Sequence, residues 1–265
     1  MEKYAALILA AGKGTRMNEG TASPIPKVMF FLNDKPIIRH SVDLIKDAGI
    51  EKVVLVVGYR KELVEEYFGD EVIYAPQEQQ LGTGHAVACA KKFLQGQAES
   101  VIIFYGDNPL YKPETIRKLV DIYEKEGPTV AMLSAFSDDP SGYGRVFRDK
   151  SGDVKAIIEH KDCNQKQLEN HEWNPGFYIF NSEWLWDNIE KLENDNSQHE
   201  FYLTDMIEKA CEQGKRIIAI PVSEESEALG INNPSQLSEA ELIIKERSKR
   251  GSNERGKQFP ESPRA

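Results

Sequence analysis

The chain has 265 residues, of which 40% are hydrophobic, and its formal net charge is -10 at pH 7. This length suits one large α/β domain with a sizeable core, and the negative charge disfavours binding to nucleic acid or to an anionic membrane. A polyanionic substrate would therefore need a local cluster of cations. The three widely spaced cysteines are typical of reduced thiols in a cytoplasmic protein. The sequence begins directly with a charged residue and a predicted strand, and no apolar run reaches the ~18 residues of a membrane span, so we expect neither a signal peptide nor a membrane helix.

Strand-like and helix-like runs alternate through the first half of the chain, which is the pattern of a parallel sheet with crossover helices. Runs rich in Val, Ile and Leu predict buried strands, and apolar residues at helical spacing predict the helices between them. The predicted strands are 4–8, 52–57, 72–75 and 101–105. The predicted helices are 37–48, 61–67 and 86–94.

The second half of the chain predicts strands interleaved with turns, and then further helices. The predicted strands are 129–136, 144–148, 154–160, 176–180 and 216–221. The predicted helices are 182–191, 204–213 and 235–247. We therefore predict a single α/β domain over residues 1–250 with a mostly parallel central sheet. Residues 251–265 are rich in Gly, Ser, Pro and charge, and they predict a disordered polar tail.

The first predicted strand runs directly into the loop LAAGKGTRM, residues 9–17. Its small residues let backbone N–H groups approach a ligand, and Lys13, Arg16 and Lys27 lie in or near it. Backbone amides and cations after the first strand of an α/β domain form an anion site. The third glycine of the dinucleotide motif and the Gly-Lys-Ser/Thr of a P-loop are both missing, so neither a hydride carrier nor a P-loop ATPase is favoured. The alternative is a tight turn with solvated lysines.

Asp107 and Gln77 are candidate ligand residues near the ends of other predicted strands. Asp107 could hold Mg²⁺, which takes one or two carboxylates together with water and substrate phosphates, or it could be a simple turn aspartate. The Gln77 amide complements the edge of a pyrimidine such as uracil. Because that amide can rotate, it could also pair with cytosine. The alternative for the Gln77 segment is a polar turn that caps the following helix.

The loop at 9–17 and the stretch that carries Asp107 belong to an ordered series of motifs. This series resembles the uridylyltransferase domain of the bacterial bifunctional N-acetylglucosamine-1-phosphate uridylyltransferase/glucosamine-1-phosphate acetyltransferase. The series is LAAGKGTRM (9–17), PKV (26–28), QLGTGHAV (80–87), YGDNPL (105–110), GYGRV (142–146), EHKD (159–162), NPG (174–176), EFYLTD (200–205) and GINN (230–233). A single member such as GTG is a weak signal, but chance does not explain the complete series in family order. The resemblance implies a Rossmann-like nucleotidyltransferase fold with an inserted sugar-binding β-rich subregion.

The resemblance also implies a role for individual residues. Those that would hold the uracil and the nucleoside are Leu9, Ala10, Ala11, Gly12, Gln77, Gly82 and Thr83. Those that would line the ribose and phosphate side are Tyr105, Gly106 and Asp107. Those that would bind the triphosphate are Lys13, Arg16 and Lys27, with Arg16 on the departing pyrophosphate. Those that would bind the sugar are Gly144, Glu159, Asn174 and Asn232, and Asn232 would share Mg²⁺ with Asp107. Each sugar-side residue could instead be an ordinary turn or cap residue.

The implied reaction is Mg²⁺-dependent transfer of UMP from UTP to N-acetylglucosamine 1-phosphate, which gives pyrophosphate and UDP-N-acetylglucosamine, a cell-wall precursor. A sugar 1-phosphate carries about -1.5 to -2 charges near neutral pH, so its oxygen can attack the α-phosphorus without a general base. Catalysis then requires alignment and charge neutralisation, which fall to Arg16, Lys27 and Asp107. The alternatives are transfer to a different sugar or polyol phosphate, and a non-catalytic nucleotide-sugar-binding protein.

Three departures from the family pattern qualify these expectations. The family continues into a β-helix that carries out acetyl transfer, whereas this chain ends in a polar segment, so acetyltransferase activity is not predicted. Pro175 stands where the family usually has Thr, and Asn108 replaces an apolar residue beside Asp107. Both substitutions bear more on which sugar is bound than on whether nucleotidyl transfer takes place.

Overall fold

The computed structural model describes residues 1–20 and 22–257 of the chain, and ten strands of this part form one sheet. In chain order these strands are β1 (Glu2–Leu9), β4 (Val53–Val57), β5 (Ile73–Pro76), β6 (Ala98–Tyr105), β7 (Val130–Phe136), β8 (Arg145–Arg148), β9 (Val154–Ile158), β10 (Glu172–Trp173), β11 (Phe177–Asn181) and β12 (Ile217–Pro221). A short hairpin of β2 (Phe31–Leu32) and β3 (Lys35–Pro36) forms a separate sheet.

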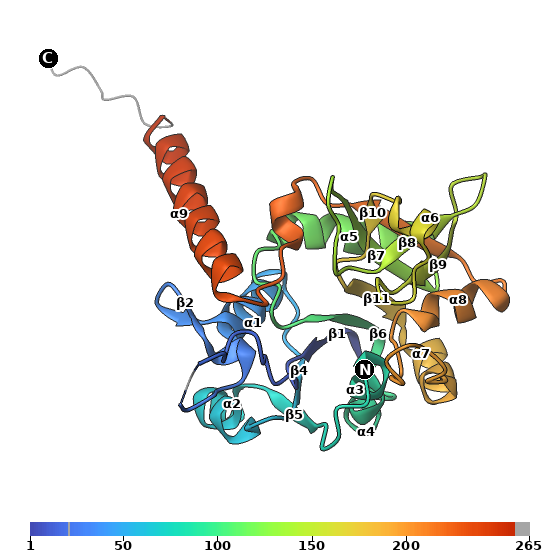
Figure 1. Ribbon diagram of the computed structural model, residues 1–265, viewed down its shortest axis with the longest axis horizontal. Coiled ribbons are helices and arrows are strands. Elements are labelled where there is room, and N and C mark those ends of the chain that lie inside the picture. The colour runs from blue at the N-terminus through green and yellow to red at the C-terminus, as the bar shows by residue number, and fades with distance from the viewer. Residues whose placement is uncertain (21, 258–265) are drawn as a thin grey trace, which may run out of the picture.

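The strand order of the large sheet is β5-β4-β1-β6-β11-β7-β10-β8-β9, and β12 pairs with β7 beside this path. β1 runs parallel to β4 and β6, and β4 runs parallel to β5. β11 is antiparallel to both of its neighbours, β6 and β7, and so joins the two halves of the chain in one sheet (Figure 1). The predicted α/β class is therefore confirmed, and the antiparallel β8, β9 and β10 form the predicted β-rich part.

Helices connect the strands and cover the sheet. The α-helices are α1 (Ile37–Asp47), α2 (Lys61–Phe68), α3 (Thr83–Cys89), α4 (Lys91–Leu94), α5 (Pro113–Glu126), α6 (Gln165–Leu168), α7 (Ser182–Asn188), α8 (Asp205–Glu212) and α9 (Pro234–Lys257). The 3-10 helices are η1 (Lys27–Met29), η2 (Gly69–Glu71), η3 (Ile189–Lys191) and η4 (Glu225–Ala228).

Several α-helices differ from the predicted elements, and the short α6 was not predicted. α5 was not predicted, although it begins with a proline and buries Ile116, Leu119 and Tyr123 at helical spacing. The predicted helix 86–94 begins earlier, at Thr83, and is divided into α3 and α4 at Ala90. α9 continues past residue 247 to Lys257, in a segment where Lys, Arg and Glu favour a helix although its two glycines do not. Residues 251–257 of the predicted tail are therefore helical, and residues 258–265 lie outside the described residues.

Both faces of the sheet are covered, because side chains along a strand point alternately to opposite faces. In β1, Leu7 and Leu9 pack in one buried cluster with side chains of α3, α4, α7 and α8. Ala6 and Ile8 pack in a second cluster with side chains of α1, α2 and α5. A strand that is apolar on both faces is typical of a sheet between two helical layers. This arrangement leaves the carboxyl ends of the parallel strands for ligands.

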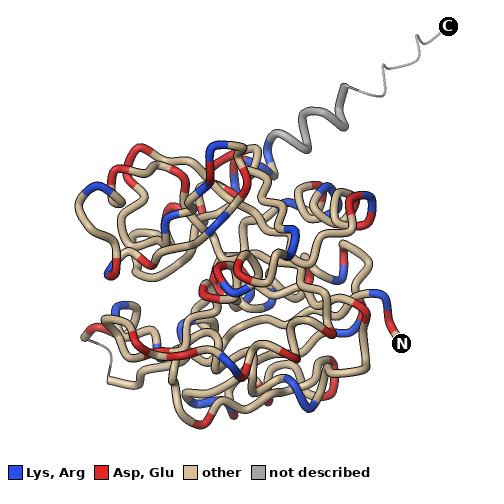
Figure 2. The backbone as a smooth tube through the Cα atoms, turned by 90° about the vertical axis from the view of Figure 1, so that its right-hand side faces the viewer, with Lys and Arg blue, Asp and Glu red and all other residues tan. Residues whose placement is uncertain are grey.

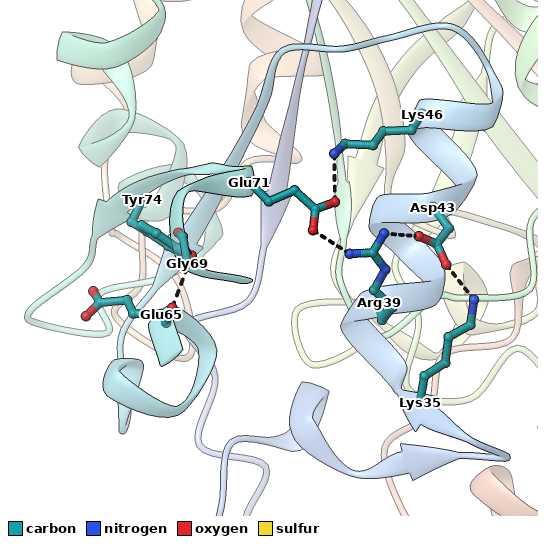
Figure 3. Close-up of polar contacts among 8 residues, drawn as sticks. All are labelled: Lys35, Arg39, Asp43, Lys46, Glu65, Gly69, Glu71 and Tyr74. Atoms are coloured by element: carbon teal, nitrogen blue, oxygen red, sulfur yellow. Dashed lines mark hydrogen bonds and ion pairs between the residues drawn. The ribbon is translucent and has the colours of Figure 1, made fainter. Parts of the chain in front are cut away.

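A network of charged side chains fastens η2, which precedes β5, to α1 (Figure 3). Glu71 accepts hydrogen bonds from Arg39 at 2.6 Å and from Lys46 at 2.7 Å, and Arg39 also pairs with Asp43 at 2.6 Å. The hydrogen bonds from Arg39 and Lys46 lower the pKa of Glu71. Since these groups are partly exposed, each pair contributes about 1 kcal/mol or less. The network thus helps to fix the approach to β5, whose carboxyl end precedes Gln77.

The last helix, α9, projects away from the rest of the molecule (Figure 1). Ala240 near its beginning is buried in a small cluster with Met17, Leu32 and Ile231. Further along, the guanidinium of Arg247 donates a hydrogen bond to the carbonyl of Leu110 at 2.6 Å. The base of α9 is therefore fixed to the loops after β1 and β6.

Acidic and basic positions are interspersed along the whole described backbone (Figure 2). The net charge of -10 is therefore not concentrated on one element. Among the helices of the described residues, none combines the length and the apolar character needed to cross a membrane.

Candidate active site

A cavity of about 450 Å³ lies at the carboxyl ends of β1 and β6, the edge where ligands bind in open α/β sheets. Most of the predicted site residues line it. They are Leu9, Ala10, Ala11, Gly12, Arg16, Lys27, Gln77, Gly82, Thr83, Tyr105, Asp107, Asn174 and Asn232. The fold thus brings motifs from both halves of the chain into one cavity wall.

The same wall contains residues that were not predicted as site residues. They are Val28, Gln80, Ala86, Asn108, Ser141, Gly142, Tyr143, Pro175, Glu200, Gly230 and Gln236. All except Ser141 and Gln236 lie inside the motifs of the ordered series, so membership of a motif was the signal that could have identified them.

The side chain of Asn18 holds the loop after β1 in shape. Its Nδ2 donates hydrogen bonds to the carbonyls of Gly14 at 3.0 Å and Ile25 at 2.8 Å, and its Oδ1 accepts from the Ile25 N–H at 2.9 Å. Gly14 has φ 63° in the left-handed region, and a Cβ there would lie 2.4 Å from the Cβ of Lys27. Glycine is therefore required for the loop to pass so close to Lys27.

Lys27, Asp107 and Asn232 form one cluster at the cavity. The Lys27 ammonium is paired with the Asp107 carboxylate and donates a hydrogen bond to Asn232 Oδ1 at 2.8 Å. The Asp107 carbonyl accepts from the Ile231 N–H at 2.9 Å, which binds the segment that carries Asn232 to the turn that carries Asp107. The Lys27 and Asp107 side chains are only 17% and 13% exposed, so the ion pair is largely shielded from solvent.

The oxygens of Asp107 and Asn232 both face one cation, the Lys27 ammonium. Carboxylate and amide oxygens are ligands of hard divalent cations, and Mg²⁺ fills its remaining positions with water and substrate phosphates. Within the described residues, no group of three or more His, Cys, Asp and Glu could hold a metal ion. The donor set therefore fits a Mg²⁺ ion shared with a phosphate substrate, and it does not fit an ion held by protein side chains alone.

The base-side residues are held in a packed wall. Gln77 is 4% exposed, and its Nε2 donates to the Gly82 carbonyl at 3.1 Å. Thr83 Oγ1 accepts from the Leu203 N–H at 2.9 Å. The beginning of α3 is thus joined both to the end of β5 and to the segment before α8.

Asn174, which also lines the cavity, is held by hydrogen bonds to its neighbours. Its Oδ1 accepts from the Gly176 N–H at 3.1 Å and its Nδ2 donates to the Tyr178 hydroxyl at 2.6 Å. The backbone N–H of Asn174 donates to the Gly144 carbonyl at 2.9 Å. Gly144 therefore supports Asn174 and does not itself line the cavity.

Asn108 and Pro175, the two substitutions that depart from the family pattern, contact each other. Asn108 is 3% exposed, and its Nδ2 donates to the carbonyl of Pro175 at 3.0 Å. The Tyr111 hydroxyl donates to the same carbonyl at 3.1 Å. Asn108 thus connects the turn after β6 with the loop that carries Asn174, a role that an apolar residue could not perform.

Glu159 lies beside Gly144 but does not line the cavity. Its Oε1 accepts from the Thr204 hydroxyl at 2.9 Å, and burial raises the pKa of its carboxyl group above the ordinary value. It lines a separate depression together with Asp162, Asp205 and other residues. As a sugar ligand, Glu159 stays a prediction.

Lys13 and Gly106 are also absent from the cavity wall. Lys13 is exposed. The Gly106 N–H donates to the Leu9 carbonyl at 2.9 Å, and the Gly106 carbonyl accepts from the Ser41 hydroxyl at 3.2 Å. Gly106 thus joins the ends of β1 and β6, and its direct contact with a nucleotide stays a prediction.

Comparison with known proteins decides the class of this chain. Residues 5–225 match the nucleotidyl transferase family. The chain belongs to this family. It is 45% identical over 243 residues to the bifunctional protein GlmU of Clostridium botulinum (strain Loch Maree / Type A3), a match that covers 91% of this chain and 52% of that protein. It is 40% identical over 249 residues to GlmU of Geotalea daltonii, and this match covers 93% of this chain and 54% of that protein.

The resemblance inferred from the motifs is thus confirmed, and the chain spans about half the length of these curated relatives. Two solved structures share the fold of this nucleotidyltransferase. A UDP-glucose pyrophosphorylase complexed with UDP-glucose has a TM-score of 0.76 and 22% identity, and the match covers 93% of this chain and 100% of that one. A putative glucose-1-phosphate thymidylyltransferase from Bacillus anthracis has a TM-score of 0.74 and 19% identity, with 91% and 94% covered. These structures confirm the predicted nucleotidyltransferase fold, and the family match confirms the predicted class of enzyme, a nucleotidyltransferase.

Proposed function

We propose that this nucleotidyltransferase uses Mg²⁺ to transfer UMP from UTP to N-acetylglucosamine 1-phosphate, with release of pyrophosphate and UDP-N-acetylglucosamine. The observation that carries the proposal is that a single cavity is lined by Gly12, Arg16 and Lys27 and also by Asn174. Two anionic reactants could therefore meet in it. Similarity to GlmU over 91% of the chain supports the choice of substrates.

The nucleotide would lie along the carboxyl ends of β1 and β6. No atom lies within 4 Å of a Cβ built on Gly12, so a base or ribose has room close to the backbone there. The uracil would contact Gln77 and the segment 9–12. The nucleoside would contact Gly82 and Thr83. The triphosphate would extend toward Arg16 and Lys27, with Lys13 at the exposed end of the loop.

The chemistry requires no side-chain nucleophile. The phosphate oxygen of the sugar 1-phosphate attacks the α-phosphorus of UTP, the bond from that phosphorus to the bridging oxygen breaks, and pyrophosphate leaves. Lys27 and Arg16 would neutralise the charge that accumulates on the phosphates and on the leaving group. Asn174 and the walls of the cavity would orient the sugar phosphate for attack.

The Mg²⁺ ion would be held by Asp107 and Asn232, which fit it as described above. When bound, it would supply Lewis-acid stabilisation of negative charge on the phosphates. Because the Lys27 ammonium contacts the same two oxygens, Lys27 would turn from Asp107 toward the phosphates when substrates are loaded. Glu159 and Gly144 would support the sugar through Asn174 and Thr204.

The proposed reaction takes place in the cytoplasm. Free thiols at Cys89, Cys163 and Cys211 agree with a reducing compartment.

The proposal is tested by measuring pyrophosphate release by the purified chain. The donor panel is UTP, CTP, dTTP and GTP, and the acceptor panel is N-acetylglucosamine 1-phosphate, glucosamine 1-phosphate, glucose 1-phosphate and a polyol phosphate. We expect the highest kcat/KM for UTP with N-acetylglucosamine 1-phosphate. A higher value for another base overturns the nucleotide assignment, and a higher value for another acceptor overturns the sugar assignment.

A further inference from the structure

The side-chain amide of Gln77 is held by two acceptors, the Gly82 carbonyl and the His85 ring. Its Nε2 donates one hydrogen bond to the Gly82 carbonyl at 3.1 Å and contacts His85 Nδ1 at 3.0 Å. A backbone carbonyl can only accept a hydrogen bond. The amide atom beside Gly82 is therefore the nitrogen, and the contact with His85 is a second one that holds the side chain in this orientation.

The same contact fixes the tautomer of His85. Since both hydrogens of Gln77 Nε2 are donated, His85 Nδ1 must accept, and the ring proton is on Nε2. That N–H lies 3.8 Å from Cys89 Sγ, a weak acceptor. Burial raises the pKa of the Cys89 thiol, so this partner stays uncharged. Gly82, Gln77, His85 and Cys89 thus form one self-consistent chain of hydrogen bonds.

Because the Gln77 amide nitrogen is already engaged, its Oε1 is the atom that can bind a ligand. Within the described residues it accepts no hydrogen bond, and Gln77 lines the cavity. Rotation of the amide would bring Oε1 against the lone pairs of the Gly82 carbonyl and of His85 Nδ1, which is unfavourable. The protein therefore presents an acceptor, and not a donor, at this point of the wall.

We propose that His85 is a positioning residue that acts through Gln77 to select uracil over cytosine. The inference rests on the proposed function, because it needs the base of UTP beside Gln77. Uracil presents an N–H donor at ring position N3, which the fixed Oε1 can accept. Cytosine presents a bare ring nitrogen at N3, which would face Oε1 lone pair to lone pair. His85 does not line the cavity, so it acts on the base only through the orientation of Gln77.

The experiment compares UTP with CTP in His85 variants of the full chain. kcat/KM is measured for both nucleotides with N-acetylglucosamine 1-phosphate, and the affinity for each nucleotide is measured by calorimetry without an acceptor. His85→Leu and His85→Ala remove the acceptor, His85→Asn offers an amide oxygen close to the position of Nδ1, and Cys89→Ala leaves Nδ1 in place. Thermal melting confirms that each variant is folded.

We expect His85→Leu and His85→Ala to lower the UTP-to-CTP ratio about tenfold, the usual effect of one mispaired hydrogen bond. His85→Asn and Cys89→Ala should keep the ratio within about twofold of the wild type. An unchanged ratio in both His85→Leu and His85→Ala, or an equal loss for both nucleotides, overturns this inference alone. A wild-type chain that does not prefer UTP to CTP overturns the base assignment of the proposed function as well.

Discussion

The Lys27 ammonium contacts both the Asp107 carboxylate and the Asn232 amide oxygen, the two groups proposed to hold Mg²⁺. A cation therefore neutralises Asp107 before any metal is bound. Mg²⁺ and Lys27 would compete for the same oxygens, so metal loading and the movement of Lys27 toward the phosphates should be coupled.

We expect Asp107→Asn to reduce turnover by at least about 100-fold, because the variant keeps the shape of the side chain but loses the charge that holds the metal. Initial rates measured over a range of Mg²⁺ concentrations check this, and thermal melting shows whether the fold is intact. Asp138→Asn, which changes an exposed aspartate outside the cavity wall, is the matched control. Wild-type rates in Asp107→Asn at every Mg²⁺ concentration would rule out the metal role.

Arg16→Ala should lower kcat by about 100-fold while the KM for the sugar phosphate changes little. Arg16 lines the cavity beside Gly12, and a cation on the leaving pyrophosphate matters most in the transition state. Arg16→Lys should restore part of the rate, because it returns the charge without the planar guanidinium. A rise in the sugar KM with an unchanged kcat would contradict this assignment.

The Asn108 and Tyr111 side chains donate to one carbonyl, that of Pro175. Removing either donor with Asn108→Ala or Tyr111→Phe should lower the free energy of unfolding by about 1–2 kcal/mol. Because the donors share an acceptor, the double variant should not equal the sum of the single effects. Denaturant unfolding of all four proteins forms the required cycle.

The same cycle has a kinetic consequence, since Pro175 follows Asn174. Asn108→Ala should raise the KM for the sugar phosphate several-fold more than the KM for UTP. An effect on UTP alone would mean that Asn108 acts through its neighbour Asp107 and not through the sugar-side loop.

Gly176→Ala should destabilise the protein strongly. Gly176 has φ 79°, and a Cβ there would lie 1.9 Å from Cε2 of the Tyr105 ring, so both backbone strain and a steric clash oppose the substitution. Gly152→Ala is the matched control, because Gly152 has φ 92° but open space around its Cβ. We expect a loss of about 1 kcal/mol for the control and about 3 kcal/mol or more for Gly176→Ala. Equal losses in the two variants would show that the Tyr105 contact is unimportant.

Stability should depend on pH through Asp205. Burial, together with repulsion by Glu159 and Glu208, raises the pKa of Asp205 from 3.8 to about 6. The folded protein thus holds this proton more tightly than the unfolded chain, so this carboxyl's contribution to the free energy of unfolding falls as the pH rises between these two pKa values and is constant above them. Asp205→Asn removes the free-energy cost of burying this negative charge.

Asp205→Asn should therefore be more stable than the wild type by about 1 kcal/mol near pH 8, after allowance for solvent screening of a partly exposed group. The gain should shrink toward about pH 4.5. Urea unfolding at both pH values measures it, and Glu212→Gln, an exposed position on the same helix, serves as the control. A gain that is the same at both pH values would show that the titration of Asp205 is not its cause.

The local pattern of apolar residues in the sequence predicted much of the fold. β1 and β4 could be predicted because continuous apolar residues make buried strands recognisable. α5 had a comparable pattern, with Pro113 at its start and Leu119 and Tyr123 on its buried face, so it was missed although the information was present. The end of α9 was harder, because its last residues have helical propensity but no apolar face that would distinguish them from a tail.

The candidate site was predictable as a set of positions, and its internal contacts were not. Asp107 and Gln77 could be singled out as candidates because each closely follows a predicted strand, and such a position is a local feature of the sequence. The hydrogen bond from Asn108 to the Pro175 carbonyl joins residues 67 positions apart, and the contact of Lys27 with Asn232 joins residues 205 positions apart. Such contacts depend on how the strands are ordered in the sheet, which residue types alone do not determine.

The position of β11 limits how this protein can change shape. β11 pairs with β6 from Phe177 to Asn181 and with β7 from Tyr178 to Phe180, so a ladder of backbone hydrogen bonds crosses from one half to the other without a break. A rotation of one half of the sheet against the other would have to break these hydrogen bonds. A hinge motion at β11 would therefore have a high free-energy cost. Closure around bound reactants should therefore be carried out by the surrounding loops, with the sheet acting as a rigid frame.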